Sequence, residues 1–129
     1  MKKVFKKMTA IAIAAAMTAG LCIGASANSV TDHNGYGNFE WTSSYAKTTN
    51  ITNQDRRVSA VINVFEDNTG KQVGGSITAS SSGVYGTSAT ARNTKYSSNG
   101  YNFQMYGEVY ASPAYQSPIV WYTGIKYMD

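Results

Sequence analysis

The 129-residue chain contains few of the residues that carry redox, metal or proton-transfer chemistry: it has one cysteine and one histidine. The cysteine, Cys22, lies in an apolar run near the N-terminus, so the chain that follows has no thiol for a disulfide or a thiolate site. The histidine, His33, lies beside Asp32 in a polar segment. A metal centre needs further ligands, and a Ser–His–Asp triad needs a base held on a rigid scaffold. We therefore predict a non-catalytic protein with no metal site and no cofactor.

The first 27 residues have the layout of a secretory signal peptide. The chain opens with four lysines (MKKVFKK), continues as an apolar run over residues 8–24, and reaches Ala25 and Ala27 at the spacing of a cleavage site. A membrane-anchoring helix is the alternative, which the short, alanine-rich run and the cleavage motif disfavour. We predict cleavage after Ala27, export to the extracellular space and no membrane span in the mature chain.

The positive charge of the chain belongs to this leader. The whole sequence has 11 basic and 7 acidic residues, which gives a formal net charge of +4. Four of the basic residues are leader lysines, so the mature chain keeps seven of each sign and is formally neutral. A neutral chain has no bulk electrostatic attraction for nucleic acid or for an anionic membrane. We therefore expect no nucleic-acid partner.

From residue 36 onward, apolar and polar residues alternate with the period of a β-strand. Residues 58–65 (VSAVINVF) have apolar side chains on both faces, which indicates a central strand. No segment after the leader sustains the period of a helix. Turn signals separate the strands at intervals of roughly ten residues, a pattern typical of sandwiches and barrels. We predict an all-β fold: a small antiparallel β-sandwich, or an open barrel, of about six to seven short strands, preceded by the helical signal peptide.

This pattern predicts a chain in three parts. The first is the signal peptide, residues 1–27. Residues 28–35 (NSVTDHNG) are polar and show no periodicity, so we expect a flexible leader there. Residues 36–129 are sufficient for a single antiparallel β domain with its own core.

The stretch FEDNTGKQVGG, residues 65–75, combines acids, glycines and a lysine, and suggests either a ligand loop or the tip of a hairpin. Residues 67–70 (DNTG) partly match a calcium-binding loop, but the required spacing and the terminal glutamate are absent. The strand-to-helix context of a phosphate loop is absent too. Asp, Asn and Gly favour tight turns, and the flanking runs alternate. We predict a hairpin loop, with a β-bulge or close backbone approach at Gly74 and Gly75.

Tyrosine is abundant, with 10 residues in the chain. Tyr106 and Tyr110 flank Glu108 on the polar face of one predicted strand, and Gln104 lies on the same face. Tyr122 comes from a neighbouring strand. Flat rings on a rigid sheet, with an acid and an amide between them, suit stacking against sugars, so these five residues are a candidate binding face. Ordinary half-buried strand tyrosines are the alternative.

Two acids on polar strand faces, Glu40 and Glu108, form a conceivable pair for glycoside hydrolysis. Such a pair must flank one glycosidic bond, and nothing in the sequence brings the two residues together. Two separate surface acids are the favoured interpretation, so the prediction of a non-catalytic protein stands.

The segment from Ser59 to Asn93 reads SAVINVFEDNTGKQVGGSITASSSGVYGTSATARN. It combines a Ser-Ala-Val strand, an Asn-Thr-Gly turn followed by a basic residue and Gln, a Gly-Val-aromatic step, and an Ala-Thr-Ala strand that ends in Arg-Asn. In these features it resembles the lactococcin 972 family of secreted bacteriocins. The resemblance implies a small, signal-peptide-bearing antiparallel β-sandwich that acts outside the cell on competing bacteria, with cell-wall precursor assembly as its target.

Two functions are therefore expected as alternatives. The first is a bacteriocin-like protein that acts on the surface or cell-wall assembly of competing bacteria, with a cell-wall precursor as its partner. The second is a secreted, non-catalytic module that binds a cell-surface or environmental glycan through the candidate binding face.

Overall fold

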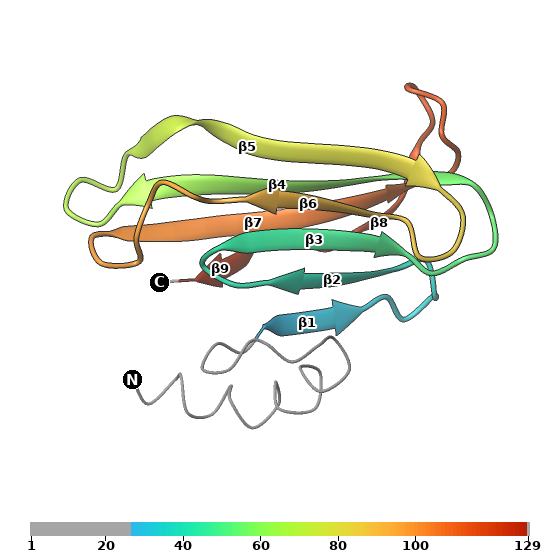
Figure 1. Ribbon diagram of the computed structural model, residues 1–129, viewed down its shortest axis with the longest axis horizontal. Coiled ribbons are helices and arrows are strands. Elements are labelled where there is room, and N and C mark those ends of the chain that lie inside the picture. The colour runs from blue at the N-terminus through green and yellow to red at the C-terminus, as the bar shows by residue number, and fades with distance from the viewer. Residues whose placement is uncertain (1–26, 129) are drawn as a thin grey trace.

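The computed structural model describes residues 27–128, which form two antiparallel β-sheets packed face to face (Figure 1). Sheet A has the strand order β1-β2-β3-β6, and sheet B has the order β5-β4-β7-β8, with β9 also paired to β7. The strands of sheet A are β1 (Asn28–Thr31), β2 (Gly37–Trp41), β3 (Tyr45–Asn50) and β6 (Ser88–Arg92). The strands of sheet B are β4 (Arg56–Glu66), β5 (Gln72–Gly83), β7 (Tyr101–Tyr110), β8 (Ile119–Tyr122) and β9 (Lys126–Met128). The predicted all-β sandwich is confirmed, and the predicted signal peptide lies outside the described residues apart from Ala27.

The core lies between the two sheets, where their inward-facing side chains meet. Sheet A contributes Phe39 and Ala46, and sheet B contributes Ile62, Phe103 and Met105, all fully buried. Each large apolar side chain buried in this way contributes roughly 1.5–3 kcal/mol. Residues 27–128 contain no cysteine, so this burial and the backbone hydrogen bonds of the sheets hold the domain together.

Two glycines let the sheets approach each other closely. A Cβ atom at Gly107 on β7 would overlap Thr48 Oγ1 and would lie 2.8 Å from Phe39 Cδ1. A Cβ atom at Gly37 on β2 would lie 2.7 Å from Val109 Cγ2. The absence of a side chain at these two positions therefore sets the local separation of the sheets.

The stretch considered as a ligand loop joins β4 and β5 as a hairpin. The Gly70 N–H donates a hydrogen bond of 2.8 Å to the Glu66 carbonyl, and Gly70 has a φ of +70°, which glycine adopts readily. The predicted irregularity is present as well, because the β4–β5 register shifts between Ile62 and Val64 and the opposite strand has Gly74 at a φ of +65°. β4 lies between β5 and β7, which confirms the predicted central strand.

The described residues form nine strands, more than were predicted, and the first difference is at the N-terminal end. Asn28–Thr31 form β1, although residues 28–35 were predicted to be a flexible leader. In the register of β1 and β2, Val30 pairs with Phe39. Asp32 then accepts hydrogen bonds of 3.1 Å from the backbone N–H groups of Asn34 and Tyr36. Pairing with β2 and the turn around Asp32 therefore stabilise β1, although its sequence shows little strand periodicity.

The second difference is at the C-terminal end, where the alternating run of residues 119–127 (IVWYTGIKY), which reads as a single strand, contributes to two short strands. β8 pairs with the last residues of β7, and β9 pairs with Phe103–Met105 nearer the start of β7. The break between them contains Gly124, which has a φ of +77°. The two short strands therefore lie along the same edge of sheet B, but the alternation of side chains in β9 is shifted by one residue relative to that in β8.

Candidate binding face

The five residues predicted as a binding face lie together on the outer face of sheet B. The inward positions of β7 are taken by Phe103, Met105, Gly107 and Val109, so the residues between them point outward. In the β7–β8 register Glu108 pairs with Tyr122, which brings the fifth residue onto the same surface. We call this surface the tyrosine face; it consists of Gln104, Tyr106, Glu108, Tyr110 and Tyr122.

An aromatic pair, Tyr106 and Tyr122, lies near the middle of the tyrosine face. Their ring centroids are 5.5 Å apart in an edge-to-face arrangement with an interplanar angle of 64°. Tyr122 is 48% exposed, so its ring is open to a ligand. Burial, followed by the negative charge of Glu108 and the interaction with Tyr122, raises the pKa of Tyr106. The Tyr106 hydroxyl group therefore stays protonated at neutral pH and can donate a hydrogen bond.

The Glu108 carboxylate is held in a fixed orientation by two neighbouring hydroxyl groups. Ser59 Oγ on β4 donates to Glu108 Oε1 over 3.1 Å, and the Tyr110 hydroxyl donates to the same oxygen. Burial, followed by this hydrogen bond to Glu108, raises the pKa of Tyr110. Because a carboxylate has about four acceptor sites, Glu108 can still accept hydrogen bonds from ligand hydroxyl groups.

Tyr110 differs from the other tyrosines of the face because a cation covers its ring. The guanidinium carbon of Arg57 on β4 lies 3.6 Å from the centroid of the Tyr110 ring. Arg57 Nη2 also donates a hydrogen bond of 2.9 Å to the carbonyl of Tyr115, in the loop between β7 and β8. In the sequence Tyr106 and Tyr110 are equivalent rings on either side of Glu108, whereas the structure leaves the Tyr106–Tyr122 pair as the open aromatic surface.

Two exposed tyrosines, Tyr127 and Tyr115, were not among the residues predicted for the binding face. Tyr127 on β9 pairs with Gln104, so it lies beside the tyrosine face, and it is 68% exposed. Simple alternation through residues 119–127 places Tyr127 on the opposite side from Tyr122. The break at Gly124 shifts this alternation by one residue, which brings Tyr127 to the same side as Tyr122. Gly124, in the middle of the alternating run, was the feature of the sequence that could have indicated the break. Tyr115, which is 85% exposed, lies in the β7–β8 loop, which stands out from the body of the sandwich (Figure 1).

The carboxylates considered for glycoside hydrolysis are not brought together. Phe39 is fully buried between the sheets, so its neighbour Glu40 points away from the core, on the outer face of sheet A. Glu108 lies on the outer face of sheet B, on the other side of the sandwich. His33 is exposed in the turn after β1. Within residues 27–128, no group of three or more His, Cys, Asp or Glu side chains is placed to hold a metal ion.

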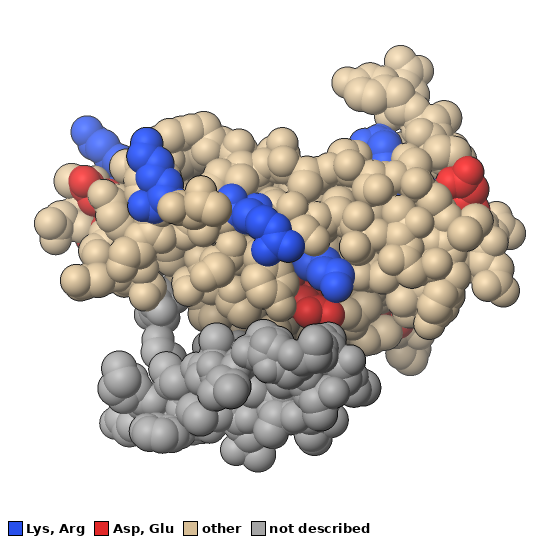
Figure 2. All heavy atoms as spheres, in the orientation of Figure 1, with Lys and Arg blue, Asp and Glu red and all other residues tan. Residues whose placement is uncertain are grey.

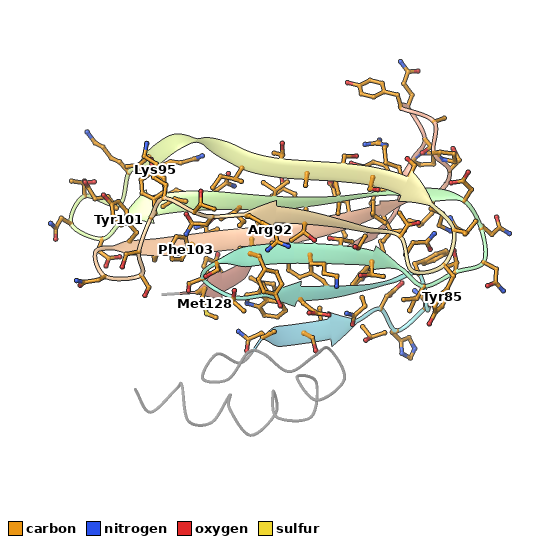
Figure 3. All side chains as sticks on the ribbon, in the orientation of Figure 1. Tyr85, Arg92, Lys95, Tyr101, Phe103 and Met128 are labelled. Atoms are coloured by element: carbon orange, nitrogen blue, oxygen red, sulfur yellow. The ribbon has the colours of Figure 1, made fainter. Side chains whose placement is uncertain are left out.

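The outer face of sheet A has a different character from the tyrosine face. Figure 2 shows a diagonal row of Lys and Arg side chains on the face that it displays, and Figure 3 labels Arg92, at the end of β6, and Lys95, in the loop that follows. Lys47 on β3 pairs with Glu40 on one side and with Thr90 on the other. The outward charged residues of sheet A are therefore Lys47 and Arg92 with one acid, Glu40, and the residues around them are mostly polar.

Among residues 27–128 there is no helix long and apolar enough to cross a bilayer. Comparison of the chain with known protein families, with curated proteins and with solved structures found no match.

Proposed function

We propose that this protein is a secreted, non-catalytic binding protein, and that its tyrosine face binds a carbohydrate of a bacterial surface. One observation carries the proposal: the Tyr106–Tyr122 pair lies beside the fixed carboxylate of Glu108 on a regular strand. The face is not needed to form the core, because the inward residues of the same strand supply that.

The chemistry of the face suits a sugar. The C–H groups of a pyranose pack against an aromatic ring, and the exposed Tyr122 ring offers such a surface. Sugar hydroxyl groups need fixed acceptors and donors, which Glu108, Gln104 and the tyrosine hydroxyls provide. Tyrosine has few rotatable bonds, and a strand is a rigid support, so binding costs little conformational entropy.

A second candidate function is bacteriocin-like action, for which binding to a cell-wall precursor of competing bacteria would be the first step. The segment that resembles the lactococcin 972 family, Ser59–Asn93, forms most of β4, the β4–β5 hairpin, β5 and β6. These elements belong to an antiparallel sandwich, which is the fold that the resemblance implies. Because of this agreement we keep bacteriocin-like action as a second candidate, which would depend on carbohydrate binding as its first step.

Binding is tested with the full-length chain on a glycan array and in pull-downs with isolated bacterial cell walls. We expect Tyr106→Ala and Tyr122→Ala each to weaken binding by about 1–3 kcal/mol, the range for a central aromatic anchor. Tyr85→Ala is the matched control, because Tyr85 is 65% exposed and lies in the loop between β5 and β6. Blank arrays together with blank pull-downs would contradict the proposal.

Bacteriocin-like action is tested separately by adding the purified protein to growing cultures of Gram-positive bacteria. We expect growth inhibition that Tyr106→Ala weakens in parallel with binding. Binding to cell walls without inhibition of any strain in a broad panel would leave the binding function and remove the toxic one.

A further inference from the structure

We infer that Arg57 binds an anionic group, a carboxylate or a phosphate, on the carbohydrate that lies on the tyrosine face; this inference rests on the function proposed above. Arg57 lies on β4, paired with Ser82 of β5 on one side. On the other side its guanidinium group reaches Tyr110 of β7. It therefore adjoins the tyrosine face at the end nearest the β7–β8 loop.

The guanidinium group of Arg57 is held in place before any ligand arrives. It stacks on the Tyr110 ring at 3.6 Å, and the Tyr115 ring lies 5.8 Å from it. Nη2 donates to the Tyr115 carbonyl over 2.9 Å, and the backbone N–H of Arg57 donates to the Ser112 carbonyl over 3.3 Å. A group fixed in this way loses little freedom on binding, and its planar fork matches the oxygens of a carboxylate or phosphate.

No negative charge neutralises this cation within residues 27–128. Its contacts are with the rings of Tyr110 and Tyr115 and with the Tyr115 carbonyl. Glu108, the acid on the same face, is engaged by Ser59 and Tyr110 instead. The Arg57 Nε atom has no hydrogen-bond partner but is buried, so an anion would bind the Nη atoms of the group instead.

The positions of the neighbouring groups indicate where the anion would lie. Glu108 repels an anion, so the anionic group belongs on the far side of Arg57, toward β5 and the β7–β8 loop. There the exposed Ser82 hydroxyl, directly across from Arg57, can donate a second hydrogen bond. The neutral part of the carbohydrate would extend from that point over Glu108 to the Tyr106–Tyr122 pair.

The test uses the full-length chain on an array in which each oligosaccharide backbone is present in a neutral, a carboxylate-bearing and a phosphate-bearing form. We expect wild-type protein to prefer at least one anionic form over its neutral counterpart by about tenfold or more, the effect of one charge-assisted contact. Which anionic form is preferred distinguishes a carboxylate from a phosphate. We expect Arg57→Gln to lower binding of the anionic form to about that of its neutral counterpart, and Arg57→Lys to retain only part of the preference, because lysine keeps the charge but loses the fork.

The control is Arg92→Gln, which removes an exposed cation from the outer face of sheet A and should leave the preference unchanged. A measurement that needs no variant is the salt dependence: the preference of wild type should shrink between about 50 mM and about 500 mM NaCl. Equal binding of neutral and anionic forms, or a preference that survives Arg57→Gln, would overturn this inference and leave carbohydrate binding in place. Failure to bind any form would overturn both.

Discussion

The two faces of β7 differ completely in composition although they belong to the same ten residues. The inward face carries Phe103, Met105 and Val109, all with 0% exposure, and Gly107. The outward face carries polar and aromatic side chains, each of them partly exposed: Gln104, Tyr106, Glu108 and Tyr110. The inward residues hold the two sheets together, whereas the outward residues contact one another and solvent.

This contrast shows that fold and binding are separable in this protein. Because side chains alternate along a strand, two neighbouring residues can serve different purposes without affecting each other. Substitutions on the inward face should therefore change stability, and substitutions on the outward face should change binding.

The largest expected effect is on the inward face. Phe103→Ala should lower the free energy of unfolding by about 3–5 kcal/mol, because it removes a large buried ring and leaves a cavity. Denaturant titration measures the effect. The control is its neighbour Gln104→Ala, which should stay within about 0.5 kcal/mol. Equal losses for the two variants would contradict the assignment of the two faces.

A smaller loss of stability is expected from adding a methyl group at Gly107. Gly107→Ala should destabilise the domain by about 1–3 kcal/mol, because the new Cβ meets Thr48 and Phe39 of the other sheet. Gly75→Ala is the matched control, since a Cβ at Gly75 has no atom within 4 Å. Thermal unfolding of both variants compares them; an unchanged melting temperature for Gly107→Ala would mean that the sheets are further apart than described.

On the outward face the effects should appear in affinity, and they should differ between tyrosines. Tyr122→Ala should weaken carbohydrate binding by about 1–3 kcal/mol, because its ring is open. Tyr110→Ala should weaken binding of a neutral sugar less, because Arg57 covers the Tyr110 ring. Calorimetric titration with a neutral sugar identified on the array measures both. A larger loss for Tyr110→Ala would place the ligand on Tyr110 instead.

The smallest expected effect is a pH dependence at alkaline pH. The pKa values of Tyr106 and Tyr110 are raised above the ordinary tyrosine value of 10.0, so the stability linked to them is complete below pH 10 and decreases as the pH rises through their folded-state pKa values. Glu108→Gln should bring both pKa values closer to 10.0, because Glu108 contributes to both increases. Absorbance of tyrosinate measures the titration; identical curves for wild type and Glu108→Gln would exclude this coupling.

Much of this arrangement could be predicted from local patterns. Strict alternation through residues 101–110 was sufficient to place Gln104, Tyr106, Glu108 and Tyr110 on one face, because the strand period is two. The turn residues between β4 and β5 were sufficient to predict a hairpin at Gly70, because Gly70 adopts a positive φ.

Other features depended on which strands become neighbours, which alternation alone does not reveal. The Arg57–Tyr110 stack joins residues of β4 and β7 that are far apart in the sequence. Tyr127 reached the outward side only because the chain changes phase at Gly124. β1 formed because β2 offered it an edge, although residues 28–31 have little strand character of their own.

The most direct test compares the outer faces of the two sheets in one binding experiment. Wild-type protein, the double variant Tyr106→Ala/Tyr122→Ala on sheet B and the double variant Lys47→Ala/Arg92→Ala on sheet A are incubated with the same isolated bacterial cell walls. We expect the sheet A variant to bind as wild type does and the sheet B variant to lose most of its binding, with both still folded by circular dichroism. Full binding by the sheet B variant, with loss in the sheet A variant, would show that the tyrosine face is not the binding surface.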